Sequence, residues 1–169
     1  MIKKENNFAY IDAANLYIGS NSLGWKLDYR RFRVWLKDKY SVQKAYLFIG
    51  LVGENKGLYE FLQDAGFILV FKETVYDGDG KVKGNCDADL VLHAACDTYE
   101  NKYDKAVIIS SDGDYACLIS FLIKKNKLRV VFSPNTSRQC SILIKRTGVP
   151  ITYLSGLKNK LGYKRKNPQ

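Results

Sequence analysis

The chain has 169 residues, of which 27 are basic and 17 acidic, giving a formal net charge of +10. This length fits one domain with a substantial hydrophobic core, and the basic charge favours a polyanionic partner, RNA or DNA above all. The polar start of the chain and the lack of a long apolar run speak against a signal peptide and a membrane span. We therefore expect a cytoplasmic protein with no membrane contact.

The predicted elements alternate between strands and helices along the chain. In chain order, we expect a strand at 8–11, a helix at 27–36, a strand at 42–49, a helix at 57–65, a strand at 67–71, a hairpin or flap around 76–81, a helix at 87–101, a strand at 106–110, a helix at 115–125, a strand at 128–132, a helix at 137–146 and an edge strand at 151–154. This alternation predicts a three-layer α/β/α fold with a mainly parallel sheet of five or six strands, in an order near 3-2-1-4-5. We expect one domain over 1–155 and a basic C-terminal tail over 156–169.

The stretch 107–115 organises this prediction. Apolar residues lead directly into the acidic turn SSDGD at 110–114, and an apolar helical pattern follows. The turn therefore lies at the carboxyl end of a strand, where open α/β sheets bind ligands. Asp12 ends the first strand in the same way, and the first and fourth strands should be neighbours. Asp12 and Asp112 are then expected in one crevice, although Asp12 could instead cap the next segment and Asp114 a helix.

Asp87 is placed by helical geometry. It shares a helix face with Leu90 and Ala94, which is the face expected to pack inward. A buried carboxylate is costly unless backbone N–H groups or a cation partner it. Asp89 points elsewhere and lies one turn from His93, so we interpret these two as a local surface pair and not as ligands.

Aspartates from separate segments that converge on one crevice suit a hard divalent cation. Mg²⁺ prefers one or two carboxylates together with waters and phosphate oxygens of the substrate. Such an ion can activate water and polarise a phosphodiester. It also reconciles an acidic crevice with a basic protein, because the basic surface attracts a nucleic-acid backbone and the ion allows that backbone to approach the carboxylates.

Other chemistries lack their motifs. The sequence contains no P-loop, no dinucleotide-binding G-x-G-x-x-G after the first strand and no G-x-S-x-G. The calcium-like DGDG at 77–80 has Ala88 where an EF-hand requires Glu. The four cysteines form no C-x-x-C pair, so we expect free buried thiols and no zinc site. A receiver-like signalling domain would need an aspartate after the third strand, where 71–73 reads FKE.

Three blocks carry a resemblance to a known family. They are YIDAANLY at 10–17, KGNCDADL at 83–90 and ISSDGDY at 109–115. In order, spacing and βα context these blocks resemble the D-x-x-N-[LI], K-G-x-x-D and S-G-D-x-D-[FY] motifs of the NYN domain family of PIN-like ribonucleases, particularly its LabA-like bacterial branch. The resemblance spans roughly residues 8–154.

The resemblance implies a metal-dependent ribonuclease that uses Mg²⁺ or Mn²⁺ and an activated water. The implied catalytic and metal-binding residues are Asp12, Asp87, Asp112 and Asp114, with Asn15 as a positioning residue. Two positions depart from the family pattern. Ser111 stands where glycine is usual, and His93 stands where some members carry a further acid.

Contacts to nucleic acid are expected around this site. The candidates are the flap lysines Lys81 and Lys83, the turn residues Ser110 and Ser111, Arg138 after the fifth strand, and Tyr17 as a stacking aromatic. Trp25 and Tyr115 are further aromatics that could stack on bases. The alternative for the lysines is simple solvation, and for the aromatics a place in the core.

The resulting prediction is an endoribonuclease acting on single-stranded or structured RNA. The alternative is a non-catalytic RNA-binding or regulatory module on the same fold. The sequence leaves open whether copies of the chain form a homo-oligomer.

Overall fold

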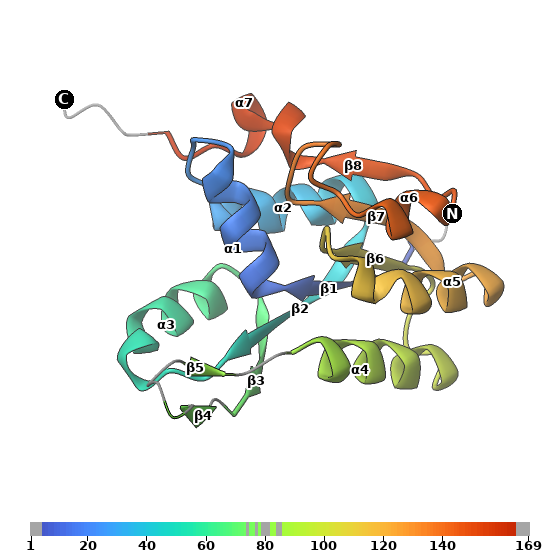
Figure 1. Cartoon of the computed structure of the whole chain (residues 1–169), viewed down its shortest axis with the longest axis horizontal. Helices are drawn as coiled ribbons and strands as arrows, with labels where there is room; N and C mark the ends of the chain where they lie inside the picture. The colour runs from blue at the N-terminus through green and yellow to red at the C-terminus, as the bar shows by residue number, and fades with distance from the viewer. Residues whose placement is uncertain (1–4, 74, 77, 79–81, 84–85, 165–169) are drawn as a thin grey trace.

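The computed structural model describes residues 5–73, 75–76, 78, 82–83 and 86–164 (Figure 1). Its centre is a six-stranded sheet in the order β3-β2-β1-β6-β7-β8, in which every neighbouring pair is parallel. The strands are β1 (Asn7–Asp12), β2 (Val42–Gly50), β3 (Ile68–Lys72), β6 (Ala106–Ile109), β7 (Leu128–Ser133) and β8 (Ile151–Tyr153). This confirms the predicted α/β fold, its strand order and the added edge strand.

Helices cover both faces of the sheet. They are α1 (Ala13–Ser22), α2 (Tyr29–Tyr40), α3 (Lys56–Asp64), α4 (Asp87–Tyr99), α5 (Ala116–Lys124), α6 (Ile142–Arg146) and α7 (Lys158–Leu161), with 3₁₀ turns η1 (Gly53–Asn55), η2 (Gly113–Tyr115) and η3 (Leu154–Gly156). A separate antiparallel pair, β4 (Val75–Tyr76) and β5 (Val82–Lys83), precedes α4 and confirms the expected hairpin. Among the residues that the structure describes, no helix has both the length and the apolar character needed to cross a membrane.

Two hydrophobic cores lie on opposite faces of the sheet, and the central strand β1 contributes to both. Ala9 and Ile11 belong to the core beneath α1, α2 and α3, whereas Phe8 and Tyr10 belong to the core beneath α4, α5 and α6. Every residue of β1 is buried. Such a strand reads as a continuous apolar run because both of its faces are covered.

Two segments differ from the prediction. Helix α1, which was not predicted, follows the first strand and continues through the polar residues 20–22, where a loop was expected. It continues because the Ser20 and Ser22 hydroxyls donate to carbonyl oxygens one turn earlier and so satisfy themselves within the helix. The helix expected at 137–146 begins only at Ile142, because the Ser141 side chain caps it by accepting from the N–H of Leu143.

The residues assigned to a basic tail are partly packed on the domain. Leu161 is almost fully buried, and its carbonyl oxygen accepts a hydrogen bond of 2.8 Å from the N–H of Asp28. The N–H of Tyr163 donates to the carbonyl oxygen of Lys26, also at 2.8 Å. The packed chain therefore extends beyond the boundary expected at residue 155, and residues 165–169 lie outside the described part.

Candidate metal centre

Three of the predicted carboxylates meet at the carboxyl edge of the sheet. One oxygen from each of Asp87, Asp112 and Asp114 lies within 4.8 Å of the others, and we call these three residues the acidic cluster. The sheet explains their convergence. Strands β1 and β6 are parallel neighbours with Ile11 opposite Ile109, so the segments that follow them leave the sheet at the same edge. Helix α4, which begins at Asp87, packs against both β1 and η2.

Asp12 adjoins the acidic cluster but is held differently. It is the N-cap of α1, where its Oδ1 accepts a hydrogen bond of 3.0 Å from the N–H of Asn15. The side chain is buried, and burial raises the pKa of the Asp12 carboxyl; the nearby Asp87 raises it further, while the Asn15 N–H opposes the shift. Oδ1 of Asp12 therefore caps the helix, as the alternative interpretation expected, while Oδ2 accepts a hydrogen bond from Tyr115.

Tyr115 joins Asp12 to the acidic cluster. Its hydroxyl lies 2.5 Å from Oδ1 of Asp87 and 3.2 Å from Oδ2 of Asp12. A phenol has one proton, so it can donate to only one of these carboxylates at a time. Burial, and then the two carboxylates, raise the pKa of Tyr115, so the hydroxyl stays a neutral donor. Tyr115 is fully buried, and the prediction that it stacks on bases is therefore wrong.

Asp112 and Asp114 are ordered by the turn that carries them. Oδ1 of Asp112 accepts from the N–H of Asp114 at 3.1 Å, so Asp112 caps η2 and the role of cap expected for Asp114 falls to it. The N–H of Asp112 in turn donates to the Ser110 hydroxyl. Asp114 is left exposed at the rim of the cluster.

A ladder of polar side chains fixes the acidic turn against α1. The Asn15 Oδ1 accepts from both the N–H and the hydroxyl of Ser111, each at 2.9 Å. The Ser111 hydroxyl accepts from the Asn135 amide at 2.8 Å, and the Ser22 hydroxyl lies 3.3 Å from Oδ1 of Asn135. Through these contacts Asn15 holds the acidic turn against α1. No role was predicted for Asn135, because its partners Ser111 and Ser22 lie in distant segments of the chain.

Ser110 and Ser111 occupy internal positions. Both are buried, and their hydroxyl groups bond within the turn or to the ladder just described. Direct contact with nucleic acid, which we predicted for both, does not suit these positions. Gly113 is equally constrained, since a Cβ atom there would lie 2.5 Å from the Ser141 Oγ. The close packing of η2 on the start of α6 therefore requires glycine at 113.

The other predicted contacts spread around the site. Tyr17 is 62% exposed on α1, and Arg138 is exposed in the turn before α6. Trp25 is partly buried against the core. Lys81 lies outside the described residues, and for Lys83 only the backbone, in β5, is described.

The predicted pair of Asp89 and His93 is wrong. Asp89 instead pairs with Lys72 at the end of β3, with 2.9 Å between Nζ and Oδ2. His93 lies 3.4 Å from Asp97, one turn further along α4. Tertiary packing of α4 against the end of β3 supplies the partner of Asp89, whereas the partner of His93 lies on the same helix. The cysteines are free as expected, but Cys96 and Cys117 are exposed and not buried.

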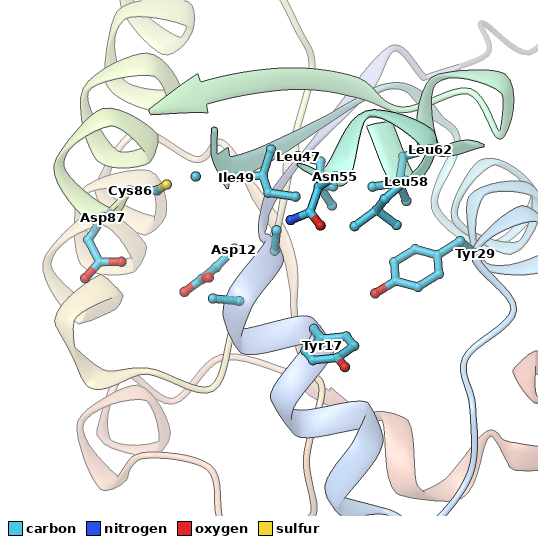
Figure 2. Close-up of a pocket in the computed structure, with 13 residues that line it drawn as sticks. Asp12, Tyr17, Tyr29, Leu47, Ile49, Asn55, Leu58, Leu62, Cys86 and Asp87 are labelled. Atoms are coloured by element: carbon cyan, nitrogen blue, oxygen red, sulfur yellow. The ribbon is translucent and has the colours of Figure 1, made fainter. Parts of the chain in front are cut away.

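A pocket of about 640 Å³ adjoins the acidic cluster (Figure 2). Asp12, Asp87 and Cys86 lie at one end of it and Tyr29 at the other. Most of the remaining surface is apolar and comes from α1, β2 and α3. The described residues that line it are Asp12, Ala13, Ala14, Tyr17, Tyr29, Leu47, Ile49, Gly50, Asn55, Leu58, Leu62, Cys86 and Asp87.

The charges at the site fit a divalent cation. Within the described chain, Asp12, Asp112 and Asp114 form no ion pair with a lysine, arginine or histidine. Burial already disfavours ionised Asp12, and the carboxylates of Asp87 and Asp112 lie close enough to disfavour it further. Oxygen donors gathered in this way are the ligands that Mg²⁺ and Mn²⁺ prefer. The residues present therefore suit such an ion.

Comparison with known proteins gives one family and one related structure. The family model of the NYN domain matches residues 9–146. A crystal structure of a protein of unknown function from Vibrio parahaemolyticus RIMD 2210633 superposes with a TM-score of 0.75, at 20% identity, over 91% of this chain and 95% of that one. At this identity the likeness concerns the fold alone. No curated protein matches the chain.

Proposed function

Because the chain belongs to the NYN domain family of PIN-like nucleases, we propose that it is a metal-dependent endoribonuclease. Its substrate would be single-stranded or structured RNA, and its cofactor Mg²⁺ or Mn²⁺. The assignment to the LabA-like branch also remains our proposal. Four free cysteines support a reducing compartment, the cytoplasm, as the place of action.

The observation that carries this proposal is the acidic cluster. Three carboxylates from two distant segments lie within 4.8 Å of one another, at the sheet edge where α/β folds bind ligands. The chain as a whole carries a net charge of +10, so the cluster is a local exception on a basic protein. A basic protein attracts the RNA backbone, while the carboxylates alone would repel it. The two features are compatible when a cation occupies the cluster.

The side chains divide the work as follows. Asp87, Asp112 and Asp114 would hold the ion, which when bound supplies an activated water and offsets the charge of the phosphodiester. Tyr115 orients Asp87 by donating a hydrogen bond to it. Asn15 keeps the turn that carries Asp112 in register with α1, through its two bonds to Ser111. Asp12, at the end of β1, adds a further carboxylate beside Asp87 and Asp112.

Cleavage of a labelled single-stranded RNA tests this proposal. The wild type is assayed with Mg²⁺ or Mn²⁺ and with EDTA, beside Asp112→Asn and a matched control, Asp38→Asn, which alters an exposed aspartate on α2. We expect cleavage that requires the metal, falls at least about 100-fold in Asp112→Asn and is unchanged in the control.

Two other outcomes would count against the proposal. Cleavage that survives in Asp112→Asn would mean that the acidic cluster is not the active site. Salt-sensitive RNA binding by the wild type and both variants, with no cleavage by any, would favour the alternative of a non-catalytic RNA-binding module.

A further inference from the structure

The pocket beside the acidic cluster has an apolar floor. Leu47 and Leu62 lie at its base and are 1% and 2% exposed. Leu58 stands at its mouth and is 44% exposed. The volume of about 640 Å³ lies within the range of roughly 300–1,000 Å³ that is usual for small-molecule sites.

Two tyrosines line the pocket away from the carboxylates (Figure 2). Tyr29 is half-buried, and burial raises its pKa to about 12, with a further contribution from the nearby Tyr17. Tyr17 is 62% exposed although it is a large aromatic residue. An exposed aromatic ring at the edge of an apolar pocket provides a surface on which a base can stack.

The pocket also offers groups that can pair with a polar edge. The Asn55 side chain, at the end of η1, projects into it (Figure 2). A carboxamide can both donate and accept, as the edge of a nucleobase requires. Apolar walls with a few polar groups are typical of sites that bind heterocyclic ligands.

We propose that this pocket receives one unpaired nucleobase of the RNA, next to the phosphodiester placed at the acidic cluster. This inference rests on the proposed function, because Asp12 and Asp87 line the pocket and also belong to the group of carboxylates proposed as the active site. A base is tied to its own phosphate through the ribose, so a base in the pocket places that phosphate at the carboxylate end.

Such a pocket would select RNA with unpaired nucleotides. A base that is paired and stacked in a duplex cannot enter a pocket, whereas one in a single strand or loop can turn outward. The enzyme would therefore cut beside unpaired nucleotides and would leave continuous duplex uncut.

The test combines a pocket-filling variant with a substrate that lacks one base. Leu58→Trp fills the mouth of the pocket from an exposed position, so the variant should fold. Leu92→Trp, which alters an exposed leucine on α4, is the matched control. The substrates are a single-stranded RNA oligonucleotide and the same oligonucleotide with one abasic site.

We expect removal of the base to slow wild-type cleavage at the adjacent phosphodiester about tenfold or more, as the loss of one stacked base implies. Leu58→Trp should cut the intact RNA about tenfold more slowly and should not respond to the abasic site. The control should behave as the wild type does. If metal-dependent cleavage persists but neither change affects it, the pocket proposal is wrong and the proposed function stands.

A binding experiment keeps the pocket testable if the protein does not cleave RNA. Adenosine, guanosine, cytidine and uridine are titrated into metal-free protein and followed by NMR. Saturable binding of a nucleoside to the wild type and the Leu92→Trp control, lost in Leu58→Trp, supports the pocket even where the nuclease proposal fails. Absence of nucleoside binding to the wild type overturns it.

Discussion

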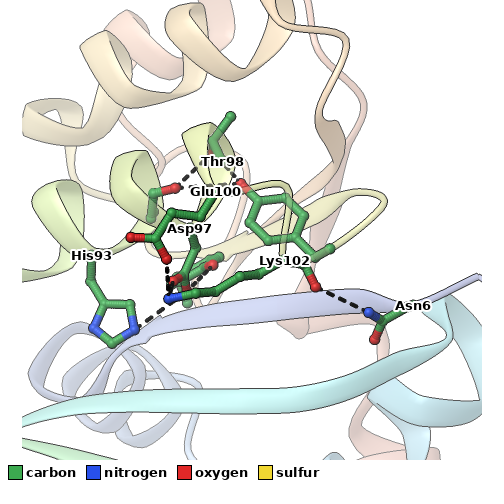
Figure 3. A network of polar contacts seen from close by, with 9 residues as sticks. Asn6, His93, Asp97, Thr98, Glu100 and Lys102 are labelled. Carbon is green, nitrogen blue, oxygen red and sulfur yellow. Dashed lines mark hydrogen bonds and ion pairs between the residues drawn. The ribbon is translucent and has the colours of Figure 1, made fainter.

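The carboxylates at the two ends of α4 differ in how their negative charge is balanced. Near the C-terminal end of α4, Asp97 is 2% exposed, and both of its carboxylate oxygens accept hydrogen bonds (Figure 3). Tyr10 donates to one oxygen and the Lys102 ammonium to the other, each at 2.9 Å, and His93 lies 3.4 Å away. The chain itself supplies the cation here. This site, which we call the Asp97 network, ties α4 to β1.

At the N-terminal end of α4, a tyrosine again meets carboxylates, but the charge balance differs. Tyr115 lies between Asp12 and Asp87 as Tyr10 lies against Asp97. In the described part of the chain, however, no lysine or arginine pairs with Asp12, Asp112 or Asp114. Asp97, which has a lysine partner, therefore stabilises the fold, whereas the carboxylates without such a partner suit an external cation.

The largest effect on stability should come from the Asp97 network. Asp97→Ala leaves the buried Tyr10 hydroxyl without its acceptor and removes the partner of Lys102, so we expect a loss of about 3 kcal/mol in the free energy of unfolding. Urea denaturation in EDTA measures it, with Asp97→Asn as a milder variant. Asp112→Ala should change this free energy by less than about 1 kcal/mol. Equal losses in both alanine variants would contradict the comparison.

A smaller loss is expected for the residue that positions the acidic turn. Asn15→Ala removes the acceptor of the buried Ser111 N–H, which should cost about 1–2 kcal/mol. Thermal or urea unfolding measures this, and Asn21→Ala, which alters an exposed residue of the same helix, is the control. A loss no greater than that of the control would show that the ladder does not hold the turn.

Asp12→Asn should stabilise the metal-free protein by an amount on the order of 1 kcal/mol at pH 7. Burial raises the folded-state pKa of Asp12 above its ordinary value of 3.8. The folded wild type therefore binds more protons than the unfolded chain between these two values, and its stability falls as pH rises through that window. Asparagine also caps helices well, so the capping role survives.

The pH dependence provides the check on that prediction. Unfolding in EDTA is measured for wild type and Asp12→Asn from pH 7 downward. The stability advantage of the variant should shrink as pH falls towards 3.8 and the wild-type carboxyl becomes protonated. An advantage that does not change with pH, or a variant less stable than the wild type at pH 7, would contradict the account.

The smallest effect is expected at Asp89, which lies close to the acidic cluster along α4 but pairs with Lys72. The side chains of Asp89 and Lys72 are 43% and 41% exposed. Exposed ion pairs contribute little, so Asp89→Asn should change stability by less than about 0.5 kcal/mol. It should also leave the binding of Mn²⁺ unchanged. A large fall in Mn²⁺ affinity would add Asp89 to the metal ligands.

Sequence reasoning predicted the strand order and the placement of Asp12 and Asp112 after two neighbouring parallel strands, because both depend on periodicity and on where each strand ends. It did not predict the role of Tyr115. The partners of its hydroxyl lie 28 and 103 residues away, and a tyrosine in an apolar helical pattern reads as a core residue. The packing of residues 156–163 was not predicted either. The lysines around Leu161 make this segment read as a solvated basic tail, although Leu161 is buried.

Titration of metal-free protein with Mn²⁺, followed by electron paramagnetic resonance, tests the central claim most directly. The wild type is compared with Asp112→Asn and with Asp97→Asn, which alter the two carboxylate sites separately. We predict saturable binding by the wild type, at least about tenfold weaker binding by Asp112→Asn, and unchanged binding by Asp97→Asn. No binding by the wild type, or equal binding by the wild type and Asp112→Asn, would contradict the account.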